Sequence, residues 1–389
     1  MRQLRMRHVV RNIVEKSDGS PQPFVGLESI EGNAGRLSAD ELPIKSATDS
    51  LRHQKGDVLF SKLRPYLAKS LMADRPGTGT GELLVLRPTP QMEPRYLLYM
   101  TLSRPWLEWA EMTSYGSKMP RTSWDAIAEC PLWLPSFQEQ RRIAHFLDTE
   151  TARIDRLRAS MIDALSLLDE RDRTTIDNVF RDGDHSRQIR RLVAKWIDYR
   201  GATPTKTEHG VPLITAGNIF NGRVDYGRSP EFISENDYDS WMRRGLPRSG
   251  DVLLTTEAPL GEVAILNDPA VALAQRIILI RPHQALDAHW IYWYFRSPLG
   301  KSELLRRATG STALGIKADR LRSVPVPVFD DAEKQQRIKN LEIGIKSTLR
   351  LRSPIGRQLE LLAERRQALI TAAVTGQFDV TTGRGADLS

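Results

Sequence analysis

The chain contains an internal repeat that divides it into two halves. Gly56-Asp57-Val58-Leu59 recurs as Gly250-Asp251-Val252-Leu253, with an offset of 194 residues (251 − 57). The same offset relates the apolar run at 84–88 to the run at 278–282. Because several landmarks keep one offset, and that offset is close to half of the 389 residues, the sequence predicts a duplicated chain with two similar halves.

The first part of each half has the pattern of a mixed α/β globule. Short apolar runs broken by Gly and Pro predict strands, and helical spacing of apolar residues predicts helices. The predicted strands are 25–27, 57–60, 83–86, 213–214, 251–254 and 274–280. The predicted helices are 96–109 and 288–307, with Pro105 and Pro298 each near a turn.

The second part of each half has the pattern of one long amphipathic helix. Apolar residues recur in steps of three and four, which is a heptad seam, and some 40 residues would form a rod of roughly 60 Å. In the first helix the seam consists of Ile143, Leu147, Ile154, Leu157, Met161, Ala164 and Leu168. In the second it consists of Ile338, Leu341, Ile345, Thr348, Arg352, Ile355, Leu359, Leu362, Arg366 and Leu369.

These helices each need a partner because their remaining residues are largely charged. Two independent coiled coils that mediate oligomerisation are one interpretation. Since a complete globule separates the helices, we favour an antiparallel pair within one chain, which would make a pseudo-twofold molecule. Pro354 and Gly356 lie inside the second heptad run and predict a bend or break there.

The fold class predicted is therefore α+β, with two mixed α/β domains joined by two long helices that form an intramolecular antiparallel coiled coil. The predicted segments are a first globular domain at 1–135, a first helical spacer at 136–182, a second globular domain at 183–330, a second helical spacer at 331–376 and a tail at 377–389.

Composition limits the class of protein but does not identify a partner. Lys and Arg exceed Asp and Glu by 56 to 48, and the resulting +8 is a modest excess for this length. It permits a polyanionic partner without requiring one. The apolar runs are shorter than a membrane span, no signal peptide is evident at the start, and Cys130 is the single cysteine. We expect a cytoplasmic protein without disulfides.

The motifs of catalysis are missing. No Pro-Pro dipeptide exists, which removes the motif that amino-methyltransferases use to hold a base. The Gly-rich stretch at 77–81 has Glu82 where a third glycine would be needed, and it precedes a predicted strand. His283 and His289 do not have zinc-ligand spacing, and Cys130 has no evident base nearby. The sequence therefore favours a protein without chemistry of its own.

The order of motifs resembles the specificity (S, or HsdS) subunit of type I restriction–modification systems. In the first half the motifs are the stretches at 56–67, 116–121 and 138–144, and in the second half they are those at 199–204, 214–219 and 364–376. Each motif is only moderately specific. Their order, which covers almost the whole chain, is highly specific.

This resemblance implies that the globular domains are target-recognition domains, each reading one half of a split double-stranded DNA target. It implies that the helical spacers fix the separation of the half-sites and dock two methyltransferase (M) subunits, to which motor-nuclease (R) subunits join. S-adenosylmethionine, ATP and Mg²⁺ are expected on those partners, and none on this chain. Because the two domains differ away from their framework, the target should be asymmetric.

The candidate DNA-binding residues are basic or polar side chains near the Gly-Asp-Val-Leu strand and the Gly-Ser loop, where a backbone could approach DNA. They are Lys62, Arg64, Lys118 and Arg121 in the first domain, and Thr205, Lys206, Thr256, Arg276 and Lys317 in the second. Each of them could equally be a solvated surface residue. The first domain lacks the Arg-Gly-x-Thr-Pro stretch of the second, so contacts cannot be transferred from one to the other.

Two other function classes stay open at this point. A scaffold whose globules bind proteins would have the same architecture, and a self-sufficient modifying enzyme would need catalytic residues that the motifs do not provide.

Overall fold

The computed structural model describes residues 4–39, 41–181, 183, 185–199, 203–310 and 314–380. Residues 200–202 of the predicted motif at 199–204, Ser311 of the second Gly-Ser loop and residues 381–389 of the predicted tail lie outside this range. The chain divides into two compact units. Unit 1 comprises residues 1–162 and 355–389, and unit 2 comprises residues 163–354, so each long helix contributes to both units.

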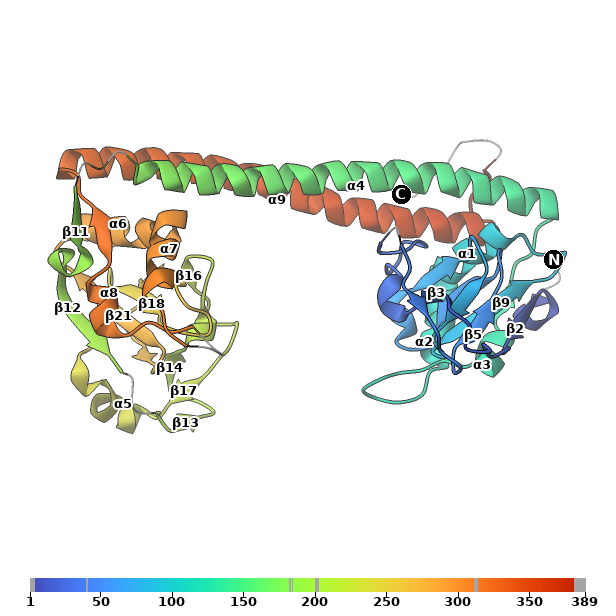
Figure 1. The fold of residues 1–389 in the computed structure, drawn as a ribbon, viewed down its shortest axis with the longest axis horizontal. Coiled ribbons are helices and arrows are strands. Elements are labelled where there is room, and N and C mark those ends of the chain that lie inside the picture. The colour runs from blue at the N-terminus through green and yellow to red at the C-terminus, as the bar shows by residue number, and fades with distance from the viewer. Residues whose placement is uncertain are drawn as a thin grey trace. The chain divides into compact units, whose positions relative to one another are not determined.

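In unit 1 the globular part, called lobe 1 here, has two four-stranded sheets among its described residues (Figure 1). The first has the antiparallel order β2-β9-β6-β7, and the second has the order β4-β3-β8-β5 with β3 and β8 parallel. The strands are β1 (Leu4–Arg5), β2 (Val10–Ile13), β3 (Gln22–Val25), β4 (Ile44–Lys45), β5 (Leu51–His53), β6 (Val58–Ser61), β7 (Ser70–Met72), β8 (Gly77–Gly79), β9 (Leu83–Pro88) and β10 (Pro131–Leu132). The helices are α1 (Pro94–Leu102), α2 (Arg104–Met112) and α3 (Trp124–Ala128), with short 3-10 turns η1 (Met6–His8), η2 (Leu27–Ser29) and η3 (Pro65–Leu67).

In unit 2 the globular part, lobe 2, repeats this topology. The sheet β12-β21-β18-β19 matches the first sheet of lobe 1, and the parallel pair of β14 with β20 matches that of β3 with β8. The strands are β11 (Ser186–Gln188), β12 (Val193–Asp198), β13 (Lys206–Thr207), β14 (Val211–Ile214), β15 (Ile219–Phe220), β16 (Arg223–Val224), β17 (Phe232–Ile233), β18 (Val252–Thr255), β19 (Val263–Ile265), β20 (Ala272–Leu273), β21 (Ile277–Pro282) and β22 (Pro325–Pro327). The helices are α5 (Glu235–Trp241), α6 (Ala285–Arg296), α7 (Pro298–Arg307) and α8 (Ala318–Arg322), with 3-10 turns η4 (Ile189–Leu192), η5 (Ala216–Asn218) and η6 (Met242–Arg244). The predicted duplication is confirmed at the level of the fold.

The Gly-Asp-Val-Leu strand is apolar throughout because both of its faces are covered. In β6, Val58 and Phe60 face the core against α1 and α2, whereas Leu59 faces a second core under the other sheet. The same alternation occurs in β18, where Leu253 faces a different core from its neighbours. Successive side chains of a strand point to opposite faces, so a strand between two cores needs a continuous apolar run.

Two details of the predicted helices are wrong. The single helix expected at 96–109 is two helices, α1 and α2, which meet at Ser103, and the one expected at 288–307 is α6 and α7, which meet at Ser297. Each serine has an extended backbone, and a proline follows within the first turn of the next helix. Proline fits that turn because its missing N–H is not needed there.

The two long helices are α4 (Phe137–Val179) and α9 (Asp331–Val374), and they run side by side within each unit (Figure 1). In unit 2, Arg352 bonds to Asp169 and Asp172, while Arg337 donates to the carbonyl of Val179. The residue numbers therefore rise on one helix as they fall on the other. The predicted antiparallel pairing is confirmed.

The seam between these helices consists of the predicted residues, with one exception. Each end of the seam packs into the core of one lobe. Ile143 and Leu147 lie in the core of lobe 1, and Ile338 and Leu341 lie in the core of lobe 2. Leu157, expected on the seam, is 47 % exposed. The other predicted seam residues are buried or half-buried, and near the middle Thr348 and Arg352 add polar contacts to Asp169 and Asp172.

Of the predicted bend or break at Pro354, the break is wrong, because α9 continues through this proline, and the bend stays a prediction. Pro354 is exposed, so the carbonyl that loses its helical hydrogen bond can bind water. Among the described residues, no helix combines the length and hydropathy that a membrane crossing requires.

Because His53 is buried, we expect lobe 1 to lose stability at acidic pH. His53 is 6 % exposed, and burial lowers the pKa of its imidazole although the charge of Asp57, a backbone hydrogen bond with Thr78 and the charge of Asp74 oppose the shift. The unfolded chain therefore binds a proton more readily, and stability is lost as the pH falls through about 6.5 toward the folded-state pKa.

Thermal unfolding of the full chain at pH 7.5 and 5.5 tests this. His53→Phe should reduce the loss at pH 5.5, whereas the matched change at exposed His209 should leave it unaltered. If both variants lose as much stability as the wild type, His53 is not responsible.

Candidate nucleic-acid interface

The repeated Gly-Asp and Arg-Pro motifs form one buried ion pair in each lobe. Arg87 binds Asp57 through two hydrogen bonds of 2.8 Å, and Arg281 binds Asp251 at 2.8 and 2.7 Å. Asp57 is 1 % exposed, and Gly56 before it has a φ of 89°. Few residues other than glycine adopt that φ, which explains the Gly-Asp pair. These ion pairs hold the Gly-Asp strand against its neighbour in each lobe.

A repeated set of backbone hydrogen bonds, called the frame here, joins three segments next to these strands. In lobe 1, the backbone N–H of Lys62 donates to Glu82 and the N–H of Thr122 donates to Lys62, at 2.8 and 3.0 Å. In lobe 2, the same bonds run from Thr256 to Arg276 and from Ile316 to Thr256, at 2.9 and 3.0 Å. The frame thus brings Lys62 close to Arg121 in lobe 1, and Thr256 close to Arg276 and Lys317 in lobe 2, from distant parts of the sequence.

In lobe 1 the frame carries an exposed loop at 114–121. Leu63 and Tyr115 each form a bridge with Arg121, and the N–H of Arg64 donates to Pro120 at 2.8 Å. Lys62, Arg64 and Arg121 are therefore neighbours, and Lys118 is exposed in the loop beside them. The predicted lobe 1 residues form one cluster.

These cations differ in their availability to a ligand. Arg121 is paired with Glu82 at 3.1 Å. Within the described part of the chain, the side chains of Lys62, Arg64 and Lys118 have no hydrogen bond or ion pair, and Arg64 has a left-handed φ of 48°. Unneutralised cations on a loop can bind phosphate, so these three are the strongest candidates of lobe 1.

In lobe 2 the predicted residues fall into two groups. Lys206 pairs with Glu231 at 2.8 Å and Arg276 with Glu257 at 3.1 Å, and both cations line a cavity of about 380 Å³. Thr205 is exposed beside Lys206 but does not line the cavity.

The other two predicted residues of lobe 2 lie on the frame. Thr256 is only 2 % exposed, and its hydroxyl donates to the carbonyl of Arg276 at 3.2 Å, so its role here is to support the frame. Lys317 is exposed at the start of α8, without a side-chain partner among the described residues.

Some residues near these clusters were not predicted from the sequence. Tyr66, Tyr115 and Met119 are large and exposed in lobe 1 around the loop at 114–121, and Gln275 lines the lobe 2 cavity beside Arg276. The sequence does contain a signal for Gln275. The repeat offset of 194 makes it equivalent to Gly81 (275 − 81), so the two halves differ at this position.

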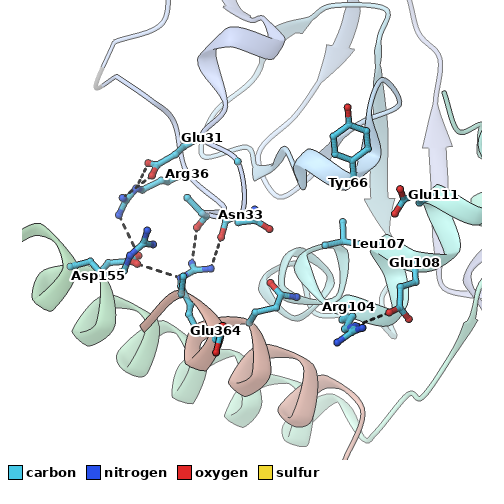
Figure 2. Close-up of a pocket in the computed structure, with 16 residues that line it drawn as sticks. Glu31, Asn33, Arg36, Tyr66, Arg104, Leu107, Glu108, Glu111, Asp155 and Glu364 are labelled. Atoms are coloured by element: carbon cyan, nitrogen blue, oxygen red, sulfur yellow. Dashed lines mark hydrogen bonds and ion pairs between the residues drawn. The ribbon is translucent and has the colours of Figure 1, made fainter. Parts of the chain in front are cut away.

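A cavity of about 550 Å³ lies where lobe 1 meets α4 and α9 in unit 1. Arg36 points toward both Glu31 and Asp155 (Figure 2), with N–O distances of 2.7 and 3.4 Å. Asp155 also pairs with the buried Arg366 at 3.4 Å, and Arg366 donates to the carbonyls of Asn33 and Ala34. Burial lowers the pKa of Arg366. This network holds lobe 1 on the paired helices.

The described residues contain no group of His, Cys, Asp and Glu side chains that could hold a metal ion. Burial raises the pKa of Cys130 to about 12, so its thiol is protonated at neutral pH and poorly nucleophilic. The clusters above can bind anions and hydrogen-bonding ligands.

Comparison with known proteins places the chain in a family. The type I restriction modification DNA specificity domain matches residues 27–163 and 200–358, which is more than half of the chain. The type I restriction enzyme MjaIX specificity subunit of Methanocaldococcus jannaschii is 30 % identical over 144 residues, covering 36 % of this chain and 33 % of the relative. The EcoDI specificity subunit of Escherichia coli is 21 % identical over 154 residues, covering 39 % and 34 %. The matched regions span about a third of the length of these relatives.

Solved structures share the fold. A chain from a structure on complex assembly and conformational transition of a type I R-M system aligns over 97 % of this chain and 98 % of its own length, with a TM-score of 0.77 and 18 % identity. The HsdS subunit from Thermoanaerobacter tengcongensis aligns over 97 % of each chain, with a TM-score of 0.54 and 18 % identity. With two matched regions, one in each half, the chain belongs to the type I restriction modification DNA specificity domain family.

Proposed function

We propose that the chain is the DNA sequence-recognition subunit of a type I restriction–modification complex and has no catalysis of its own. The observation that carries this proposal is the pair of identical backbone frames that present different side chains. Lys62 and Arg64 accompany the frame of lobe 1, whereas Lys317 and the Lys206–Arg276 cavity accompany that of lobe 2. Cations bind the phosphate backbone, and polar side chains read base edges. Because the side chains differ between the two frames, the two lobes would recognise different half-sites.

The paired helices support the proposed protein partners. Several large apolar side chains on α4 and α9 are exposed and are available for contact with a protein partner. They are Leu157, Ile162, Leu167, Ile343, Leu349, Leu351 and Leu361. We propose that two methyltransferase subunits dock here and that motor-nuclease subunits join them. S-adenosylmethionine, ATP and Mg²⁺ would be held by those partners, and a cytoplasmic location remains a prediction.

Footprinting of the complex reconstituted with its modification subunits tests the proposal. A specificity subunit should protect two short DNA segments separated by an unprotected spacer. A triple variant Lys62→Ala/Arg64→Ala/Lys118→Ala should weaken binding and flatten its salt dependence, because fewer phosphate contacts release fewer counterions. A protein-binding scaffold would protect no DNA, and that result would overturn the proposal.

The helix pair makes a prediction about the spacer. Inserting one heptad at opposite positions of α4 and α9 adds about 10 Å, or about three base pairs of DNA at 3.4 Å each. The methylated motif should keep both half-sites and gain a longer spacer. An insertion in α9 alone, which disrupts the pairing, should reduce methylation instead. An unaltered spacer after the paired insertion would show that the helices do not set it.

A further inference from the structure

One turn is built alike in the two lobes. We call residues 80–83 and 274–277 the variable turn. It is closed by hydrogen bonds from Leu83 to Thr80 at 3.0 Å and from Ile277 to Ala274 at 3.4 Å. Its first residue is fixed to the neighbouring parallel strand, by Thr80 bonding to Val25 and Ala274 bonding to Ile214. The backbone bonds to Lys62 and Thr256 described above hold its third residue.

The two central residues of this turn differ completely between the lobes. Lobe 1 has Gly81 and Glu82, whereas lobe 2 has Gln275 and Arg276. The charge at the third position is reversed, and each charge has its own partner, Arg121 for Glu82 and Glu257 for Arg276. A conserved backbone with different side chains would allow each lobe to recognise a different DNA sequence.

The lobe 2 turn faces a polar cavity. Gln275 lines the cavity of about 380 Å³ with Lys206, Thr215, Ser229 and Arg276. Among the described residues, its carboxamide makes one weak contact, in which its oxygen accepts a hydrogen bond of 3.4 Å from the hydroxyl of Thr203. The carboxamide therefore keeps donor and acceptor capacity for a ligand. The pairing with Glu257 holds Arg276 beside it.

We infer that Gln275 is a specificity-determining residue that reads an A·T pair in the half-site of lobe 2. This inference rests on the proposed function. A carboxamide matches the N6 donor and N7 acceptor of adenine in the major groove. Gly81 has no side chain at the equivalent position of lobe 1, so that lobe reads its half-site without this contact.

Methylation mapping with the full chain and its modification subunits tests the inference. With Gln275→Ala, one A·T position in one half-site should lose its base preference by about tenfold or more. The other half-site and the spacer should stay the same. Gln188→Ala is the matched control, because Gln188 is exposed on β11 away from the cavity.

A second variant keeps the test decisive if the first one lowers methylation. Gln275→Glu keeps the size of the side chain but only accepts hydrogen bonds, so the preferred base should change from adenine to cytosine. An unchanged motif in both variants, or a change in both half-sites, would overturn the inference. If the wild-type complex methylates no two-part motif, the proposed function itself fails.

Discussion

Replacing Lys334 with methionine should lower the free energy of unfolding of unit 2 by about 3 to 5 kcal/mol. Lys334 lies in the first turn of α9, 5 % exposed, and its ammonium bonds to Asp287 at 3.0 Å and Asp331 at 3.1 Å. Burial acts to lower the pKa of Lys334, but these hydrogen bonds outweigh it and leave the pKa raised. The lysine is therefore charged, and its loss would leave the buried Asp287 without its cation.

Urea denaturation of the full chain measures this effect. The exposed Lys339→Met on the same helix is the control and should cost little. Adding Asp287→Leu to Lys334→Met should recover most of the loss, because a buried ion pair can often be exchanged for apolar residues without cost. If Lys334→Met is as stable as the control, the ion pair does not anchor lobe 2 on α9.

Exchanging residues 1–135 for the first lobe of another family member should alter one entire half of the DNA target. Each lobe has its own cores and its own copy of the buried Asp–Arg ion pair. The transplanted lobe must keep the residues that contact the helices, such as Tyr96, whose hydroxyl donates to the carbonyl of Val374, and Glu93, whose N–H donates to Gln140.

The effect should be larger than that of any single substitution, because each mismatched base pair costs about 1 to 3 kcal/mol and a half-site contains several. Mapping of the methylated motif before and after the exchange provides the measurement. The reciprocal exchange of residues 183–330 should alter the other half. Changes in both halves after one exchange would contradict independent reading by the two lobes.

The repeat could be found in the sequence because the same buried ion pair requires the same residues in both lobes. The buried carboxylate of Asp57 needs Arg87, and the turn before it needs a glycine, so these residues recur in lobe 2 as Asp251 and Arg281. The long helices were predictable for a similar reason. Their apolar spacing follows from burying one face along many turns.

What the sequence could not provide were contacts between distant residues. Arg121 is neutralised by Glu82 and Arg276 by Glu257, and nothing in the linear order indicates these pairs. Arg366 was predicted on the helix seam, yet its guanidinium reaches the carbonyls of lobe 1. Thr256, the residue after β18, is buried by segments that are distant in the sequence, so its burial has no local signal.

Mapping every methylated base in DNA from cells that contain the chain and its modification subunits tests the account most directly. The account predicts one motif with two unlike half-sites and a spacer of fixed length whose bases are not read. A continuous motif, two identical half-sites or methylation without sequence preference would contradict it.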